Sequence, residues 1–435
     1  MNASMAVPAL RRAAMTVSML GVATVVGALM VFLTQTLLAR KMGPDAYGLF
    51  ASSLATVTMI APLAGFGLTQ FRLKAYGVEG WTADRWLQPS LRFTLATTVL
   101  AVCSIVAWAM LAAPRDGTRF SLLVLTPVIL SVLTVNLASN KFRLEDRFAR
   151  MALNQLAIPG SRLLVAIGLL LVPQLGWRFV AIAYGSISLL MALSAVPQIR
   201  AMFRGEIALK GHGQKPDAIA YGATPGMGEV WSQAWAYGVY AALYPVFFQI
   251  STILLKYFQS DAHAGRYAIA LAVMTAIYLI PATIYQKFLQ GKLHRWAAHD
   301  RPKFRFAYRK GNAGMFVLGL LVGAAMLAFG PWLVPLAFGE RYRGVVAILM
   351  VLSICPPVRF LSTAMGAALM TGGHMRLRVQ AMAMATIVAV AGNVLLIPRF
   401  SEMGAAWATV VAEAALLFGT WLGVRKLHPE LTHGP

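Results

Sequence analysis

Two arginines stand where charged side chains are rarely found, near the centres of long apolar runs. Arg162 lies in the run 152–172 and Arg359 in the run 345–370. A guanidinium at the middle of a membrane helix costs about 2.5 to 3.5 kcal/mol on insertion scales, so each should face a water-filled cavity or a partner. Because guanidinium groups bind phosphates through paired hydrogen bonds, we expect both to bind an anionic headgroup, most simply a diphosphate. An ion pair with Glu413, or a side chain that extends to the membrane surface, is the alternative.

Glu413 is the one acidic residue, of fifteen, that lies in the middle of an apolar run. A carboxylate removed from water titrates nearer to neutral pH, so Glu413 could take up a proton or a cation and couple a transport cycle to it. Contacts between helices, or a pair with an arginine, explain it equally well. Two buried cations beside a single carboxylate favour an anionic ligand.

Three further arginines could contact the same ligand. Arg40 and Arg266 lie at the outer ends of apolar runs and Arg72 at an inner end, where the usual role of arginine is to anchor a helix at the membrane interface. Amides within the runs are weaker candidates, and hydrogen bonds between helices explain most of them; they are Gln35, Asn136, Asn140, Asn154, Gln155, Gln249 and Asn393.

The motifs of common catalytic sites are absent from the sequence. It has no paired carboxylates, no Cys/His spacing of a metal site, no nucleophile elbow and no glycine-rich phosphate loop. Cys103 and Cys355 both lie in apolar runs, and we expect them to be small buried hydrophobic side chains. We therefore predict no catalytic residue, no metal and no cofactor, and a protein that is not an enzyme.

The composition is that of a protein whose side chains face lipid. Hydrophobic residues make up 59% of the 435 and charged residues only 12%, far from the balance of a soluble domain. Apolar runs in a bilayer must form helices, which satisfy their own backbone groups. The formal net charge of +23 is spread over short connections, where lysine and arginine face anionic lipid headgroups rather than nucleic acid.

Twelve apolar runs predict an all-α polytopic membrane protein with about 12 transmembrane helices. They lie at 14–38, 48–69, 93–113, 120–139, 152–172, 178–198, 231–255, 265–286, 312–337, 345–370, 379–397 and 403–424. With the N-terminus and every second connection on one side, that side carries 26 lysines and arginines and the other side 10. The positive-inside rule then places both termini in the cytoplasm.

The longest connection divides the runs into two sets of six. We expect an N-terminal six-helix lobe at 1–198, a cytoplasmic linker rich in glycine and proline at 199–230, and a C-terminal six-helix lobe at 231–435. DAYGLFASSLATVTMIAP in the second run resembles GRYAIALAVMTAIYLIP in the eighth, and the tyrosine and proline of the two segments match. Because a unit of six spans keeps its polarity when duplicated, the two repeats should be parallel, with a cleft between two lobes.

Prolines recur inside the runs, and each removes a helical hydrogen bond. They could form hinges near the cleft, or reflect the ordinary frequency of proline in membrane helices. The residues are Pro62, Pro127, Pro159, Pro245, Pro281, Pro356 and Pro357.

The most basic connection, Lys292–Lys310, mixes cations with aromatic side chains. We expect it to lie on the cytoplasmic membrane surface and to contact anionic lipids, because it adjoins two spans and such lipids are at hand. It could also gather an anionic lipid substrate.

One stretch carries a family resemblance. Residues Leu37–Gln70, LLARKMGPDAYGLFASSLATVTMIAPLAGFGLTQ, resemble the signature between the first two spans of bacterial polysaccharide biosynthesis membrane proteins, the Wzx-type lipid-linked oligosaccharide flippases. The resemblance extends through AGRYAIALAVM at the eighth run and GAAWATVVAEAALL at the twelfth, where family members often carry an acidic residue comparable to Glu413. These flippases share a superfamily with the MATE drug exporters and the lipid II flippases. Arg266 departs from the family, in which an apolar or small residue is more usual.

The resemblance implies a MATE-like, two-lobed transporter of the bacterial inner membrane. It would move an undecaprenyl-diphosphate-linked oligosaccharide by alternating access through a cationic cavity, for O-antigen, capsule or exopolysaccharide biosynthesis. Coupling to H⁺ or Na⁺, and association with polysaccharide polymerase or assembly proteins, would fit that role. A drug or cation antiporter of the same superfamily is the nearest alternative, but it should carry more carboxylates at membrane depth. A polytopic glycan polymerase or ligase is a further one, which the short outward connections disfavour.

Overall fold

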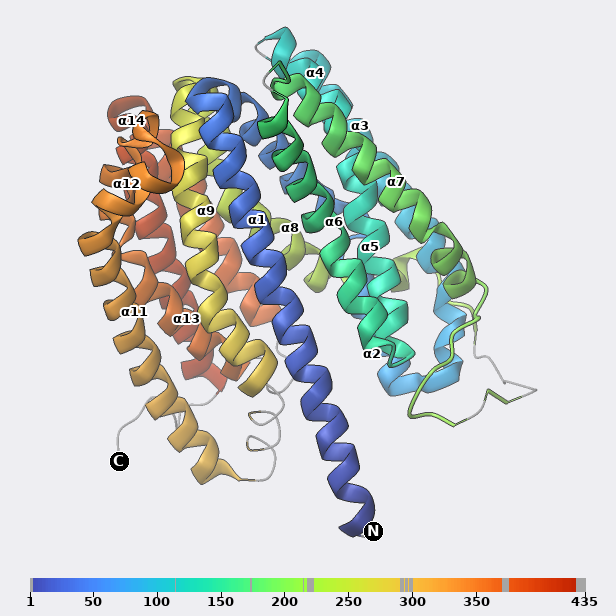
Figure 1. Ribbon diagram of the computed structural model, residues 1–435. Coiled ribbons are helices and arrows are strands. Elements are labelled where there is room, and N and C mark those ends of the chain that lie inside the picture. Colours follow the sequence, from blue (N-terminus) through green and yellow to red (C-terminus); the bar gives the residue numbers. More distant parts are fainter. Residues whose placement is uncertain are drawn as a thin grey trace. The chain divides into compact units, whose positions relative to one another are not determined.

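A computed structural model describes residues 3–113, 115–172, 174–213, 215–216, 223–289, 293, 296, 300–369 and 375–427. In these residues all regular elements are helices (Figure 1). In chain order they are α1 (Ala3–Ile60), η1 (Ala61–Leu63), α2 (Leu68–Glu79), η2 (Gly80–Trp86), α3 (Leu87–Leu111), α4 (Asp116–Leu125), α5 (Pro127–Leu144), α6 (Phe148–Leu171), α7 (Trp177–Phe203), α8 (Met227–Phe258), α9 (Asp261–Thr283), η3 (Ile284–Leu289), α11 (Arg301–Phe338), η4 (Glu340–Tyr342), α12 (Val345–Leu352), α13 (Cys355–Leu369) and α14 (Met375–Leu427).

The helices are long and apolar enough to make this a multi-pass membrane protein, as the sequence predicts. By length and composition, eight segments in the described residues could cross a bilayer, and the bent pair α12 and α13 would make nine. Two of these segments, Met19–Leu111 and Met375–Leu427, each contain more than one predicted run. The number of twelve spans, and their pairing as parallel repeats, therefore stay predictions.

Local backbone geometry breaks the longest helices where the sequence places small or polar residues. Gly43 has φ 77° and ψ 172° within α1, and Ser401 has φ 51° and ψ −129° within α14. Glycine adopts positive φ without a steric penalty, which explains the turn at Gly43. The axes of α12 and α13 differ by 44°. The second predicted run, 48–69, is not one helix, because α1 ends at Ile60 and α2 begins at Leu68 after two positive-φ glycines, Gly65 and Gly67.

The prolines divide into two structural classes. Pro159, Pro245 and Pro281 lie inside helices α6, α8 and α9. The others lie in first turns or in a short 3₁₀ turn, at Pro62, Pro127, Pro356 and Pro357, where the missing N–H removes no helical hydrogen bond. Only the first class can act as kinks within a helix.

The two cysteines differ in environment. Cys355 is buried, as expected, whereas Cys103 is exposed. The prediction for Cys103 is wrong because an apolar run marks contact with lipid as readily as contact with protein. Half of a membrane helix such as α3 can face hydrocarbon.

The described chain forms two compact units of interleaved segments. The first unit comprises residues 1–31, 57–165 and 178–242, and the second comprises 32–56, 166–177 and 243–435. Helices α1, α6, α7 and α8 therefore contribute residues to both, α7 only through Trp177. Within the second unit α11 packs on α12 and α13, and α14 packs on α12 and α13.

In the first unit, part of the predicted linker is fixed to helix ends. Lys210 N donates to Leu144 O at 3.1 Å, at the end of α5. Trp81 Nε1, in η2, donates to His212 O at 3.3 Å, and Lys215 Nζ pairs with Asp84 Oδ2 at 2.8 Å. Residues 214 and 217–222 of the linker lie outside the described part of the chain.

In the second unit, the hairpin around Gly43 packs tightly on the start of α9. A Cβ atom at Gly48 would lie 1.7 Å from the backbone oxygen of Asp261, and one at Gly265 would lie 2.2 Å from that of Pro44. Tyr342 Oη donates to Ala39 O at 3.2 Å from the other side of the hairpin. Small residues thus let two backbones touch, as is usual where membrane helices cross closely.

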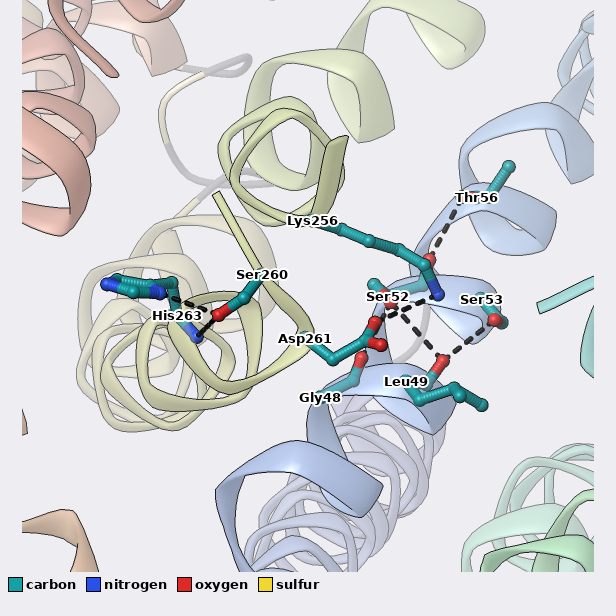
Figure 2. Close-up of polar contacts among 9 residues, drawn as sticks. All are labelled: Gly48, Leu49, Ser52, Ser53, Thr56, Lys256, Ser260, Asp261 and His263. Atoms are coloured by element: carbon teal, nitrogen blue, oxygen red, sulfur yellow. Dashed lines mark hydrogen bonds and ion pairs between the residues drawn. The ribbon is translucent and has the colours of Figure 1, made fainter. Parts of the chain in front are cut away.

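A buried ion pair lies at this crossing. Lys256 Nζ, near the end of α8, is 3.2 Å from Asp261 Oδ1, at the start of α9, and the two side chains are only 4% and 8% exposed. Figure 2 shows the pair beside Gly48 and Ser52 of α1. Ser52 Oγ donates to Gly48 O at 2.6 Å, within its own helix. The Lys256–Asp261 ion pair therefore joins the two ends of the turn between α8 and α9, and each of its charges depends on the other.

We predict that Gly48→Ala destabilises the protein, because its Cβ atom would overlap the backbone of Asp261. Overpacking of this kind costs about 1 to 3 kcal/mol. Gly168→Ala is a matched control within helix α6, since nothing lies within 4 Å of its Cβ position. Thermal unfolding of the purified protein in detergent measures both. Equal midpoints for the two variants would contradict the close crossing.

We predict that Lys256→Met is more destabilising than the double variant Lys256→Met/Asp261→Asn. Removal of one partner of a buried pair costs about 3 to 5 kcal/mol because the other charge is left uncompensated, whereas removal of both is often nearly neutral. The same unfolding measurement tests the order. Strictly additive losses would show that the two charges do not interact.

Candidate functional site

Arg359 lies in the second unit, near the start of helix α13. The helix begins at Cys355, and Pro356 and Pro357 lie in its first turn. A Cβ atom at Gly319 of α11 would lie 2.4 Å from Pro357 Cα, and one at Gly323 would lie 2.5 Å from Ser353 O. These glycines let α11 and α13 approach closely, so the turn that carries Arg359 has a fixed position against its neighbour.

Arg359 and Glu413, which are 54 positions apart in sequence, form an ion pair. Arg359 Nη1 donates to Glu413 Oε2 at 3.4 Å, and the side chains are 10% and 1% exposed. The other carboxylate oxygen, Oε1, has no hydrogen-bond partner among the described residues. The structure thus pairs the two central charges, which is one of the two arrangements that the sequence allowed.

Four aromatic rings surround the Arg359 guanidinium. Its Cζ lies 4.9 Å from the ring centroid of Phe248, 5.2 Å from Tyr278, and 5.9 Å from both Tyr244 and Phe247. Ring faces attract a cation at these distances, and more so away from water. We call Arg359, Glu413 and these four rings the Arg359 cage.

The aromatic part of the cage was missed by reasoning from the sequence, although a signal existed. Tyr244, Phe247 and Phe248 are spaced at i, i+3 and i+4, which places three rings on one face of α8. They look like ordinary packing residues until Arg359 is known to lie against that face. Tyr278, on α9, carries no local signal at all.

Arg162 lies in the first unit and also faces an aromatic ring. Its Cζ is 4.5 Å from the ring centroid of Tyr184, on α7. Its Nε has no hydrogen-bond partner among the described residues. Arg162 is only partly buried. The Tyr184 ring face offsets part of the cost of removing its guanidinium from water.

The other three arginines have different surroundings. Arg266 Nε pairs with Glu402 Oε1 at 2.5 Å, on a partly exposed surface of the second unit. Arg40 is exposed. Arg72 is 2% exposed, lies with its Cζ 5.0 Å from the ring of Phe203, and donates from Nε to Leu68 O at 3.4 Å. Its two terminal nitrogens have no hydrogen-bond partner among the described residues.

The five arginines do not gather in one unit. Arg72 and Arg162 belong to the first unit, and Arg40, Arg266 and Arg359 belong to the second. A single cationic cavity that contains all five, and the coupling role of Glu413, therefore stay predictions.

Three of the candidate amides donate hydrogen bonds to backbone carbonyl oxygens. Asn140 Nδ2 donates to Thr69 O at 2.7 Å, and Asn154 Nδ2 donates to Val135 O at 3.1 Å, each between helices. Asn393 Nδ2 donates to Ala389 O at 2.7 Å within α14. Asn140 and Asn154 thus make the interhelical hydrogen bonds expected for most of the amides, whereas Asn393 bonds within its own helix. Among the described residues, no group of three or more His, Cys, Asp or Glu side chains could hold a metal ion.

Comparison with solved structures shows the fold. The chain superposes on the lipid II flippase MurJ in an inward closed conformation with a TM-score of 0.70 and 12% identity, covering 93% of this chain and 87% of that one. It is similar to an inward-facing multidrug resistance MATE family transporter of the MOP superfamily, with a TM-score of 0.69, 14% identity and coverage of 93% and 95%. It is also similar to a MOP superfamily transporter from Pyrococcus furiosus, whose binding pocket is described as having reversed polarity, at a TM-score of 0.60, 14% identity and coverage of 96% of each chain. The fold is MATE-like.

Comparison of sequences shows the family. No curated protein matches this sequence. The profile of the polysaccharide biosynthesis protein family matches residues 14–288, which include the stretch Leu37–Gln70 and most of the first eight predicted runs. The chain therefore belongs to the polysaccharide biosynthesis protein family.

Proposed function

We propose that this protein is a flippase that moves an undecaprenyl-diphosphate-linked oligosaccharide across the bacterial inner membrane by alternating access. Its product would serve the biosynthesis of O-antigen, capsule or exopolysaccharide. Membership of the polysaccharide biosynthesis family supports this substrate class, and the likeness to a lipid II flippase supports a fold that can pass a lipid-linked sugar. The observation that carries the proposal is a buried guanidinium held by a carboxylate that could be exchanged for a diphosphate.

The exchange follows from charge and geometry in the Arg359 cage. Arg359 Nη1 donates to Glu413 Oε2 at 3.4 Å, at the long end of the hydrogen-bond range. A diphosphate carries more negative charge than a carboxylate and matches the planar fork of a guanidinium. Because the cage is shielded from water, protonation of Glu413 would release Arg359 to such an anion. Substrate and proton would then use the cage in alternation.

Arg162 would contribute a second phosphate contact without such a competitor. It faces Tyr184 rather than an acidic residue, and an arginine without a carboxylate partner retains its attraction for anions. Arg40, Arg72 and Arg266 are further candidates, and Arg266 would first have to leave Glu402.

Both termini would lie in the cytoplasm, and polymerase or assembly proteins could receive the flipped product.

A cation-coupled drug antiporter is the second candidate, because a ring-lined site with a carboxylate also suits a cationic drug. Several solved structures of this fold are MATE multidrug transporters. In the present chain the place among the rings is filled by Arg359 itself. Because the protein's own guanidinium occupies this place, the site favours an anionic substrate over a cationic one. A polymerase or ligase activity is a weaker candidate.

Deletion of the gene is the direct test of function. We expect lipid-diphosphate oligosaccharide to accumulate on the cytoplasmic leaflet while surface polysaccharide disappears. Normal surface polysaccharide without accumulation would overturn the flippase proposal. Export of cationic dyes by purified protein in vesicles, with no movement of the lipid-linked sugar, would support the antiporter instead.

We predict that Arg359→Gln and Arg162→Gln each lower flipping by about tenfold or more, since a hydrogen bond to a charged group contributes about 1.5 to 3 kcal/mol. Complementation of the deletion strain measures this, with membrane insertion checked by blotting. Arg150→Gln, at an exposed position on α6, is the matched control. Because Arg359→Gln leaves Glu413 unpaired, Arg359→Gln/Glu413→Gln separates misfolding from lost binding. Full activity of both single variants would remove the headgroup role.

We predict that Glu413→Gln abolishes the response of flipping to an imposed proton gradient, because the amide cannot take up a proton. The assay compares flipping rates in proteoliposomes with and without a pH gradient, and then a sodium gradient. Glu340→Gln is the control, since Glu340 is exposed in η4 and pairs only with neighbouring Arg343 in the contacts observed. A wild-type protein whose rate ignores both gradients would exclude coupling at Glu413.

A further inference from the structure

The first ten residues of α11 form a basic groove outside the apolar part of the helix. A cavity of about 500 Å³ is lined by Arg301, Pro302, Arg305, Phe306, Arg309 and Lys310. Four of these six residues carry positive charge and none is acidic. We call this surface the α11 groove.

The groove has a fixed orientation because the opposite side of the helix is anchored. Phe304 and Tyr308 are 3% and 8% exposed, and they lie one turn apart on one face of α11. Arg301, Arg305 and Arg309 recur at the same four-residue interval on another face. The helix therefore presents a row of guanidinium groups outward while two aromatic side chains hold it to the protein.

An aromatic side chain stands in the middle of the cations. Phe306 is 66% exposed, although full burial of a phenylalanine side chain normally favours an equilibrium by about tenfold to a hundredfold. An exposed ring flanked by arginines and lysine is typical of a surface that rests at the boundary between headgroups and acyl chains.

The groove continues without a break into a membrane helix. α11 runs to Phe338, and its later turns expose apolar side chains such as Val317 and Leu321, at 54% and 63%. A helix rises 1.5 Å per residue, so Lys310 lies about 10 Å and Arg301 about 24 Å before Val317 along the helix axis. The groove therefore adjoins the apolar part of α11 on the side where lipid headgroups would lie.

The nearest acidic residue on the helix does not fill the groove. Asp300, just before α11, accepts a hydrogen bond from Lys303 N at 3.1 Å, and pairs with Lys303 Nζ at 2.7 Å. Lys303 is not part of the groove lining. Residues 290–292, 294–295 and 297–299 of the basic connection lie outside the described chain, and the described residues that line the groove all belong to α11.

We propose that the α11 groove binds the headgroup of an anionic phospholipid, with the guanidinium groups of Arg301 and Arg305 on the phosphate and the ring of Phe306 against the acyl chains. Paired N–H donors match phosphate oxygens, and cations near an anionic leaflet each strengthen binding. The site is separate from the Arg359 cage and does not depend on which substrate the protein carries.

Native mass spectrometry of the full-length protein in detergent, titrated with phosphatidylglycerol, tests the proposal. The variant Arg301→Gln/Arg305→Gln/Lys310→Gln should raise the apparent Kd by about fivefold for each cation removed. Arg92→Gln/Arg143→Gln/Arg150→Gln removes the same charge from exposed positions elsewhere, and should change Kd less than about twofold. Phe306→Ser should weaken binding by about tenfold while all charges remain.

Other outcomes would overturn the proposal. Phosphatidylcholine that binds the wild-type protein as tightly as phosphatidylglycerol would remove charge recognition. Equal losses in the two triple variants would mean that net charge, and not the groove, binds lipid. Inorganic phosphate or a short single-stranded oligonucleotide that binds the groove more tightly than phosphatidylglycerol would assign it to a different ligand. Thermal unfolding of each variant confirms that its fold is intact.

Discussion

A charge inside a bilayer must find its counter-charge or its solvation within the protein, and this constraint organises the structure. The Arg359–Glu413 and Lys256–Asp261 pairs each join two different helices at sites almost closed to water. Neither charge of such a pair is tolerable without its partner, since the desolvation cost exceeds what one hydrogen bond returns. The helices that carry the charges are therefore fixed relative to one another, and the aromatic residues complete the solvation.

Close backbone contact is the second requirement for these pairs. Gly48 and Gly265 let the hairpin of α1 touch the start of α9, beside Lys256 and Asp261. Gly319 lets α11 touch the first turn of α13, two residues before Arg359. In lipid no hydrophobic driving force holds helices together, so van der Waals packing at small residues has to do so. The positions of the buried charges thus depend on side chains that carry no chemistry themselves.

The Arg359 cage combines an ion pair with aromatic contacts. Arg359 Nη1 lies 3.4 Å from Glu413 Oε2, and its guanidinium also lies against ring faces. Cation–π contacts tolerate rotation of the guanidinium better than hydrogen bonds do, because a ring face has no single bonding direction. The rings therefore add to the solvation of the Arg359 guanidinium without fixing its direction.

Consecutive residues were enough to predict the class of the protein and to identify its unusual charges. Apolar runs predicted membrane helices, the stretch Leu37–Gln70 predicted the family, and depth within a run singled out Arg162, Arg359 and Glu413. These features are local, because hydropathy and motif are written in consecutive residues. Hydropathy did not reveal every helix break: the apolar run 48–69 is interrupted between Ile60 and Leu68.

The partners of these side chains became evident from the packing of the helices. Arg359 could have faced water or Glu413, and its position against α14 selected the carboxylate. Arg162 met Tyr184 and Arg266 met Glu402, and nothing in the spacing of those residues announced either contact. Cys103 lies toward the outside although its neighbours in sequence are apolar. The physical reason is common to all four: hydropathy measures how deep a residue lies in the bilayer, whereas its neighbours depend on how helices far apart in the chain rotate and pack.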